Sequence, residues 1–149
     1  MVLKEGNLMP EFRGVTQNGS PFASSELKNK WAVIYFYPKD FTPGCTAQAC
    51  SFRDIYEDFT AAGAEVVGIS SDSAGSHDKF AEKHKLPFIL LSDGNKKLQR
   101  LFGVPRSVFG LLPGRVTYIV NPEGKIVSVF NSMNANKHIE HAKQLILNG

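Results

Sequence analysis

The chain has 149 residues, 42% of them hydrophobic, which fits one compact domain over residues 1–149 with a buried core. Its 17 Lys and Arg residues against 14 Asp and Glu residues give a net charge of only +3, with no basic block, and this argues against binding to nucleic acid or a membrane surface. Two cysteines are too few for a disulfide scaffold or a four-thiolate metal site, and no apolar run reaches the ~20 residues needed to span a bilayer.

Apolar runs and turn residues predict the elements of the first half of the chain. The run WAVIYFY is continuous, rich in β-branched and aromatic residues and stopped by Pro38, as expected of a central strand covered on both faces. The next apolar residues recur at helical spacing until Gly63. The expected elements are a hairpin at Phe12–Phe22 with a two-residue Asn18-Gly19 turn, a strand at 31–37, a helix from Cys45 to about Ala62, and a strand at Ala64–Ser70 parallel to the first.

The second half of the chain continues the alternation of helices and strands. The expected elements are a helix at Ala74–His84, a short strand at Pro87–Leu91, a short helix at Lys96–Phe102, a hairpin over residues 115–130 and a helix at Lys137–Leu147. This order predicts an α/β fold in which a central mixed sheet is flanked by helices and carries an N-terminal hairpin extension.

Both cysteines lie in the stretch YPKDFTPGCTAQAC, and Cys45 opens the predicted helix two residues after Pro43. Its sulfur should lie near unpaired backbone N–H groups and the positive end of the helix dipole, where a thiolate is favoured. The dipole alone is too weak to activate a thiol, so a second positive group is needed, and Arg106 and Arg115 stand at strand entrances. Thr42 adds a hydroxyl that can both donate and accept a hydrogen bond.

Cys50 follows Cys45 by five residues. In a regular helix their Cα atoms would be roughly 8–9 Å apart, whereas a disulfide needs less than about 7 Å. Either the two cysteines never form a disulfide with each other, or the first turns of the helix must unwind before they can. Inert packing is the alternative, but Cys50 lies off the apolar stripe of the helix and Cys45 follows a T-P-G loop, which favours a redox role for the pair.

Other candidate features carry weaker signals. His138 and His141 stand at i, i+3 near the C-terminus and are expected at the surface, and His77 and His84 have no partner spacing. Residues 105–115, PRSVFGLLPGR, form an apolar segment that is either exposed near the cysteines or packed on its own domain.

With these residues in place, the chain resembles the peroxiredoxins, specifically the bacterioferritin-comigratory-protein or Q-type subfamily. Pro38, Thr42 and Cys45 match the family motif P-x-x-x-T-x-x-C, written here P-K-D-F-T-P-G-C. Arg115 in P-G-R-V-T-Y matches the family's active-site arginine, and Gln48 matches a Glu or Gln position that helps to orient it.

The resemblance implies a thioredoxin-like fold and a thiol peroxidase that reduces hydrogen peroxide and organic hydroperoxides. Cys45 would attack the peroxide and become a sulfenic acid while Thr42 and Arg115 orient the substrate. Cys50 stands where the subfamily places a resolving cysteine, and it would form an intramolecular disulfide that thioredoxin or a similar dithiol reduces. The resemblance gives loop-shaping and substrate-orienting roles to Pro38, Pro43, Gly44 and Gln48, and it implies no metal, haem or flavin.

Two other classes of protein share part of this pattern. A general disulfide oxidoreductase would share the fold but normally uses a C-x-x-C pair, whereas four residues separate the cysteines here. A metal carrier would need a histidine near the two cysteines, and none lies near them in the sequence. The intramolecular partner for Cys45 favours a monomer. The location is expected to be cytoplasmic, or plastid if an organelle-targeting peptide has been removed before residue 1.

Overall fold

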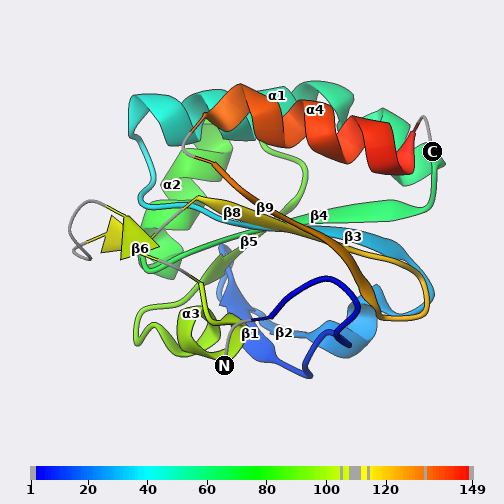
Figure 1. Ribbon diagram of the computed structural model, residues 1–149. Helices are drawn as coiled ribbons and strands as arrows, with labels where there is room; N and C mark the ends of the chain where they lie inside the picture. The colour runs from blue at the N-terminus through cyan, green and yellow to red at the C-terminus, as the bar shows by residue number, and fades with distance from the viewer. Residues whose placement is uncertain (1–2, 105, 108–111, 114, 133, 148–149) are drawn as a thin grey trace.

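The computed structural model describes residues 3–104, 106–107, 112–113, 115–132 and 134–147. A seven-stranded sheet in the order β2-β1-β5-β4-β3-β8-β9 runs through the middle of the molecule (Figure 1). The elements are β1 Arg13–Thr16, β2 Pro21–Ala23, the 3-10 helix η1 Ser24–Leu27, β3 Trp31–Phe36, α1 Pro43–Ala61, β4 Ala64–Ser70, α2 Ala74–His84, β5 Ile89–Ser92, α3 Lys97–Phe102, β6 Arg106–Ser107, β7 Leu112–Pro113, β8 Val116–Val120, β9 Ile126–Asn131 and α4 Ala135–Ile146.

The sheet is mixed, as predicted. Strand β3 pairs in parallel with β4 and antiparallel with β8, while β5 is parallel to β4 and antiparallel to β1. Residues 32–36 of β3 are all buried, which confirms that this run of β-branched and aromatic residues forms a central strand. Tyr37 has left the strand but is still buried.

The two faces of the sheet are covered differently. Helices α1, α2 and α4 cover one face, called the helical face, whose buried cluster includes Val33, Tyr35 and Phe52 (Figure 1). Helix α3 and the N-terminal hairpin cover the other, called the hairpin face, whose cluster includes Ile34 and Phe102. Alternate residues of β3 therefore enter two separate cores, and apolar burial at about 25 cal/mol per Å² stabilises both.

Several predicted boundaries shift by about two residues, for local reasons. Helix α1 begins at Pro43 rather than Cys45, because proline is well suited to the first helical position. Strand β5 begins at Ile89 rather than Pro87, and proline lacks the N–H that a strand interior needs. Helix α4 begins at Ala135, where the side chain of Asn134 caps it by accepting from the N–H of Asn136 (3.1 Å).

The N-terminal hairpin is confirmed, but its turn is longer than predicted. Strands β1 and β2 are joined by the four residues 17–20 instead of a two-residue Asn-Gly turn. The backbone N–H of Thr16 donates to the carbonyl of Ser20 (2.9 Å), and Gly19 adopts a positive φ of 82°. The turn signal therefore located the hairpin correctly but not its register.

The two C-terminal histidines and the apolar segment 105–115 differ from their expected descriptions. The expectation that His138 lies at the surface is wrong, because its side chain is fully buried, and His141 is half-buried. The apolar segment 105–115 contains the short strands β6 and β7, which were not predicted. Residues 105, 108–111 and 114 of that segment lie outside the described residues. Within the described part of the chain, no helix is long and apolar enough to cross a membrane.

Candidate active site

The first turn of α1 places Cys45 at the end of the central strand. Strand β3 leads through residues 37–42, called the nucleophile loop, to Thr42, which precedes the helix, and to Pro43, which begins it. The Thr42 hydroxyl donates to the carbonyl of Lys39 (2.8 Å) and makes no capping bond to the helix. The N–H groups of Gly44 and Cys45 therefore keep the free donor capacity of a helix start, and the positive end of the dipole lies beside the thiol.

Arg115 supplies the second positive group that the sequence required. It directly precedes β8, and the pairing of Phe36 with Val116 brings this end of β8 next to the nucleophile loop. Its Nη2 donates to Cys45 Sγ at 3.4 Å, and its Nη1 donates to Gln48 Oε1 at 2.5 Å. All three side chains are less than 5% exposed (Cys45 1%, Gln48 0%, Arg115 4%). A guanidinium in contact with a buried sulfur stabilises negative charge there more than it would in water.

Gly44 is what allows the arginine to come this close. A Cβ added at Gly44 would lie 2.9 Å from Arg115 Nη2. Any larger residue at position 44 must push away the guanidinium group that contacts Cys45. The glycine of the T-P-G-C stretch thus has a steric role, and its exposed backbone leaves one side of the first turn open.

Some buried polar atoms on the helical face have no hydrogen-bond partner. Among the described residues, the buried side-chain polar atoms without a hydrogen-bond partner are the Tyr35 hydroxyl, Gln48 Nε2 and Arg115 Nε. Buried polar groups are normally paired, because leaving one unpaired costs about 1–3 kcal/mol. Burial first, and then the negative charge of nearby Cys45, raises the pKa of Tyr35 well above its usual value, so this hydroxyl stays neutral. Gln48 and Arg115 thus keep unused hydrogen-bonding capacity beside the Cys45 thiol.

Cys50 lies on the same helix but not in the same environment. It is half-buried where Cys45 is buried, and both cysteines are free thiols. Because α1 is regular α-helix from Pro43 to Ala61, the spacing of roughly 8–9 Å expected between their Cα atoms applies. The structure brings Cys45, Gln48, Gly44 and Arg115 together, and it does not bring Cys50 within bonding distance.

The remaining residues singled out from the sequence border this group. Pro38 is half-buried near the start of the nucleophile loop and Pro43 is exposed just after its end. The side chain of Arg106, the other arginine named from the sequence, lies outside the described part of the structure. Sequence reasoning missed Asp40 in the loop, which is only 3% exposed. A charged residue inside the otherwise apolar and proline-rich YPKDFTP stretch was the signal that could have found it.

Three ligand atoms of Asp40, Asp72 and His77 lie within 4.8 Å of one another, a spacing that could suit a metal ion. Hydrogen bonds already use them: His77 Nδ1 lies 2.6 Å from Asp40 Oδ2, and Asp72 Oδ2 accepts from the backbone N–H of Asp40 (2.7 Å) and the hydroxyl of Ser70 (2.9 Å). These contacts satisfy the cluster from within, so it is better described as part of the loop's support than as a metal site.

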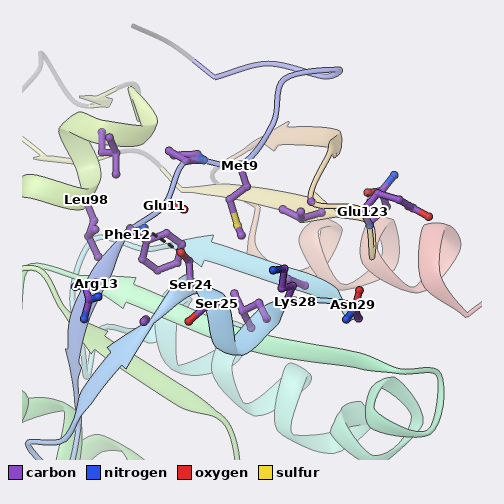
Figure 2. A pocket seen from close by; sticks show the side chains of 18 of the residues that line it. Met9, Glu11, Phe12, Arg13, Ser24, Ser25, Lys28, Asn29, Leu98 and Glu123 are labelled. Carbon is purple, nitrogen blue, oxygen red and sulfur yellow. Dashed lines mark hydrogen bonds between the residues drawn. The ribbon is translucent and has the colours of Figure 1, made fainter.

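A cavity of about 750 Å³ lies far from this group, on the hairpin face (Figure 2). Its walls include Ala32 and Val120, which pair at the opposite end of β3 and β8 from Phe36 and Val116. Figure 2 shows charged side chains such as Arg13 around it, and the Ser24 hydroxyl there accepts from the backbone N–H of Phe12 (3.0 Å). Neither a cysteine nor a histidine is among the residues that line it, so the cavity itself offers no thiol or imidazole.

The chain is similar over nearly its whole length to several known proteins. Residues 6–129 match the model of the AhpC/TSA family. The chain is 50% identical over 143 residues to the chloroplastic peroxiredoxin Q of Sedum lineare, covering 95% of this chain and 77% of the relative. The crystal structure of peroxidoxin BcpB from Mycobacterium tuberculosis superposes with a TM-score of 0.89 at 33% identity, covering 98% and 97% of the two chains. A structure of the bacterioferritin comigratory protein of Xanthomonas campestris matches with a TM-score of 0.85 at 32% identity, covering 92% and 90%.

Proposed function

The chain belongs to the AhpC/TSA family and is a peroxiredoxin of the Q type, a thiol-dependent peroxidase with a thioredoxin-like fold; on this premise we propose that Cys45 is its peroxidatic nucleophile. The observation that carries the proposal is the contact of 3.4 Å between Arg115 Nη2 and Cys45 Sγ at the start of α1. The arginine and the helix N-terminus both favour the thiolate, which is the nucleophilic form of cysteine.

The first step is attack of the Cys45 thiolate on one oxygen of the peroxide. An S–O bond forms, the O–O bond breaks, and the leaving oxygen takes a proton and departs as water or an alcohol, so that Cys45 becomes a sulfenic acid. Arg115, the free N–H groups of the first turn and the hydroxyl of Thr42 can hold the two oxygens and stabilise charge on the leaving one. Gln48 fixes the direction of the guanidinium through Oε1.

The second step joins the two cysteines. The Cys50 thiol attacks the sulfenic sulfur, the S–O bond breaks, an S–S bond forms, and the oxygen leaves as water. A regular helix holds the Cα atoms roughly 8–9 Å apart, so the first turns of α1 must unwind before this bond can form. Helix ends are among the elements that open at the lowest cost, which supports local unwinding rather than a larger rearrangement.

A thiol reductant then restores both cysteines by exchange, and we propose a thioredoxin-type dithiol for this role. Small peroxides are the substrate class, and alkyl hydroperoxides belong in it because the Xanthomonas campestris relative is described by its alkyl peroxide reduction activity. A monomer can complete the cycle, since both redox residues lie in one helix. The plant relatives are named chloroplastic, which supports the plastid option over the cytoplasm.

The decisive assay follows NADPH oxidation with thioredoxin, thioredoxin reductase and hydrogen peroxide. Wild-type protein should turn over, and Cys45→Ser should not. Cys50→Ser should consume one equivalent of peroxide, then stall as a sulfenic acid and become more prone to sulfinic oxidation, because no resolving thiol remains. Turnover of Cys45→Ser at the wild-type rate would refute the assignment of the nucleophile.

The route to the disulfide needs its own measurement. Amide exchange within residues 43–53 should be faster in the oxidised protein than in the reduced one, while β3 and β4 stay protected. Non-reducing gels of peroxide-treated protein should show a disulfide within one chain. A mainly intermolecular Cys45–Cys50 bond, or unchanged exchange in the oxidised form, would contradict the in-chain mechanism.

A further inference from the structure

A buried acid in the nucleophile loop is held by three side chains that play no part in the chemistry above. Asp40 lies five residues before Cys45, and its Oδ1 accepts from the hydroxyl of Tyr37 at 2.6 Å. Its Oδ2 accepts from the hydroxyl of Ser76 at 2.9 Å and lies 2.6 Å from Nδ1 of His77. Asp40, Tyr37, Ser76 and His77 are called the Asp40 cluster below.

Counting donors and acceptors shows that His77 and Asp40 share a proton. Nε2 of His77 lies 3.0 Å from the carbonyl of Leu91, which can only accept, so Nε2 carries a hydrogen. Nδ1 faces a carboxylate oxygen at 2.6 Å, and two lone pairs cannot make this contact, so a second proton lies between the residues. Both side chains are almost fully buried (His77 0%, Asp40 1% exposed), and water does not compete for the bond.

These contacts attach the nucleophile loop to three elements that do not include α1. Ser76 and His77 belong to α2, and His77 continues to β5 through Leu91. The backbone N–H of Asp40 donates to Oδ2 of Asp72, which follows β4 (2.7 Å). The side-chain bond of Thr42, by contrast, ends within the loop itself, at Lys39. Asp40 therefore links the middle of the loop to the elements around it, in addition to the backbone bond from Tyr37 to Ile69 of β4 (3.1 Å).

Phe41, which follows Asp40 in the loop, has a strained backbone. Phe41 has a φ of 64°, in the left-handed region that aromatic residues rarely adopt, and its side chain is 46% exposed. Its ring packs edge-on against Phe80 of α2, with centroids 5.1 Å apart. Such a conformation persists only where the surrounding contacts enforce it, and strained residues near a nucleophile often belong to its conformational control. The contacts of Asp40 on one side and of the Phe41 ring with Phe80 on the other are the ones that can enforce this conformation.

We propose that Asp40 and His77 are positioning residues that hold the nucleophile loop, and with it the first turn of α1, in the conformation that reacts with peroxide. The proposal rests on the function assigned to Cys45 above. The cluster keeps Cys45 against Arg115 and opposes the unwinding that disulfide formation needs. Weakening it should thus change the two chemical steps in opposite directions: slower reaction with peroxide and faster formation of the Cys45–Cys50 disulfide.

The test uses two mild variants, each of which removes one hydroxyl from the cluster. Tyr37→Phe and Ser76→Ala should each lower the rate constant for hydrogen peroxide by about two- to fivefold, a typical effect of one hydrogen bond, when measured in a Cys50→Ser background. In chains that keep Cys50, rapid-quench mass spectrometry should show the disulfide forming faster by a similar factor. The sulfinic fraction per turnover should fall, because sulfenic acid is resolved sooner.

Matched controls separate positioning from loss of stability. Tyr118→Phe also removes a buried tyrosine hydroxyl, but on the hairpin face, and it should leave both rate constants unchanged. Asp40→Ala should change both by about tenfold or more, since it leaves the proton-sharing partner unpaired. Asp40→Asn should change both rate constants less than Asp40→Ala does, because an amide can accept from Tyr37 and donate to a neutral His77.

The outcomes are distinguishable. If Tyr37→Phe and Ser76→Ala leave both rate constants at wild-type values, or lower both together, the positioning role is wrong, and the mild variants decide this even if Asp40→Ala does not fold. If the unaltered protein fails to oxidise Cys45 with peroxide, the proposed function itself is wrong. If the wild-type protein forms the Cys45–Cys50 disulfide and the Tyr37 and Ser76 variants keep both wild-type rate constants, only the inference about Asp40 and His77 is overturned.

Discussion

The two faces of the sheet have comparable apolar cores but different polar chemistry. On the helical side lie the thiol of Cys45 and the three buried, unpartnered polar atoms of Tyr35, Gln48 and Arg115 found among the described residues. The hairpin face has the cavity of about 750 Å³, yet the buried Ser24 hydroxyl in its wall is hydrogen-bonded. Cavity volume alone therefore does not mark the site. Buried polar groups without hydrogen-bond partners on the side of a buried thiol are a better indicator of a site. A bound substrate can supply the missing hydrogen bonds and so offset the free-energy cost of leaving these groups unpaired.

The largest effect should come from replacing the guanidinium of Arg115. Arg115→Lys keeps the charge but loses the planar group that contacts Cys45 and Gln48 together, and kcat/KM for hydrogen peroxide should fall by roughly 10²–10³, as for one lost transition-state donor. Arg13→Lys, beside the cavity on the hairpin face, should leave peroxidase kinetics unchanged. Equal losses in the two variants would remove the functional difference between the faces.

A second prediction concerns the buried side chain of His138 and the stability of the protein at acid pH. Burial first, and then the nearby positive charge of Arg115 and His141, lowers the pKa of His138 from its usual 6.5 to about 4, against the opposing effect of its hydrogen bond to the carbonyl of Ser132. The native state thus favours the neutral ring, which donates from Nε2 to Ser132 (2.6 Å) and accepts at Nδ1 from Thr117 (2.7 Å).

Acid should lower the free energy of unfolding, because the unfolded chain binds a proton on His138 at a higher pH than the native protein does. The contribution of His138 is complete above pH 6.5 and is lost as the pH falls from 6.5 toward 4. The free energy of unfolding should fall by roughly 2–3 kcal/mol more in the wild type than in His138→Gln between pH 7 and pH 4. Denaturant titrations at both pH values measure this difference, and an equal fall in both proteins would contradict it.

A smaller effect on catalysis should follow from Gly44→Ala. The new methyl group would lie 2.9 Å from Arg115 Nη2, so the guanidinium must shift away from Cys45, and peroxide reduction should slow by about tenfold. Gly14→Ala is the matched change on the hairpin side, where the nearest atom to an added Cβ is 3.4 Å away on Leu91. That variant should keep wild-type kinetics in the same peroxide assay, and a similar slowing of both would show that the contact with Arg115 is unimportant.

The smallest expected effects have opposite signs on the two faces. Tyr35→Phe removes a buried hydroxyl without a described partner and should raise the free energy of unfolding by about 1 kcal/mol. Tyr118→Phe removes a hydroxyl that donates to the carbonyl of Phe102 (3.4 Å) and should lower it by about 0.5–1 kcal/mol. Urea denaturation of both variants checks the signs. A destabilised Tyr35→Phe would show that its hydroxyl has a partner after all.

The sequence by itself determined the order of the main helices and strands, and it singled out Cys45 as the candidate nucleophile. Three predictions from local patterns are confirmed: the continuous strand β3, the helix after Cys45 and the hairpin of β8 and β9. They hold because hydrophobic periodicity and turn residues act over only a few positions. The match of Pro38, Thr42 and Cys45 to a family motif is local as well. Errors at this level were the ends of helices and strands, such as the start of α1 at Pro43, the length of the hairpin turn, and the short strands β6 and β7, which were not predicted.

Only the tertiary structure decided which distant groups contact one another. The family resemblance names Arg115, but spacing along the chain does not distinguish it from Arg106, and its contact with Cys45 depends on the pairing of β8 with β3. His138 looked like a surface residue because i, i+3 spacing says nothing about which face of a helix is covered. The contact of Asp40 with His77, 37 positions away, was invisible for the same reason. Burial and long-range hydrogen bonds arise from packing between elements, and a single sequence does not encode that packing locally.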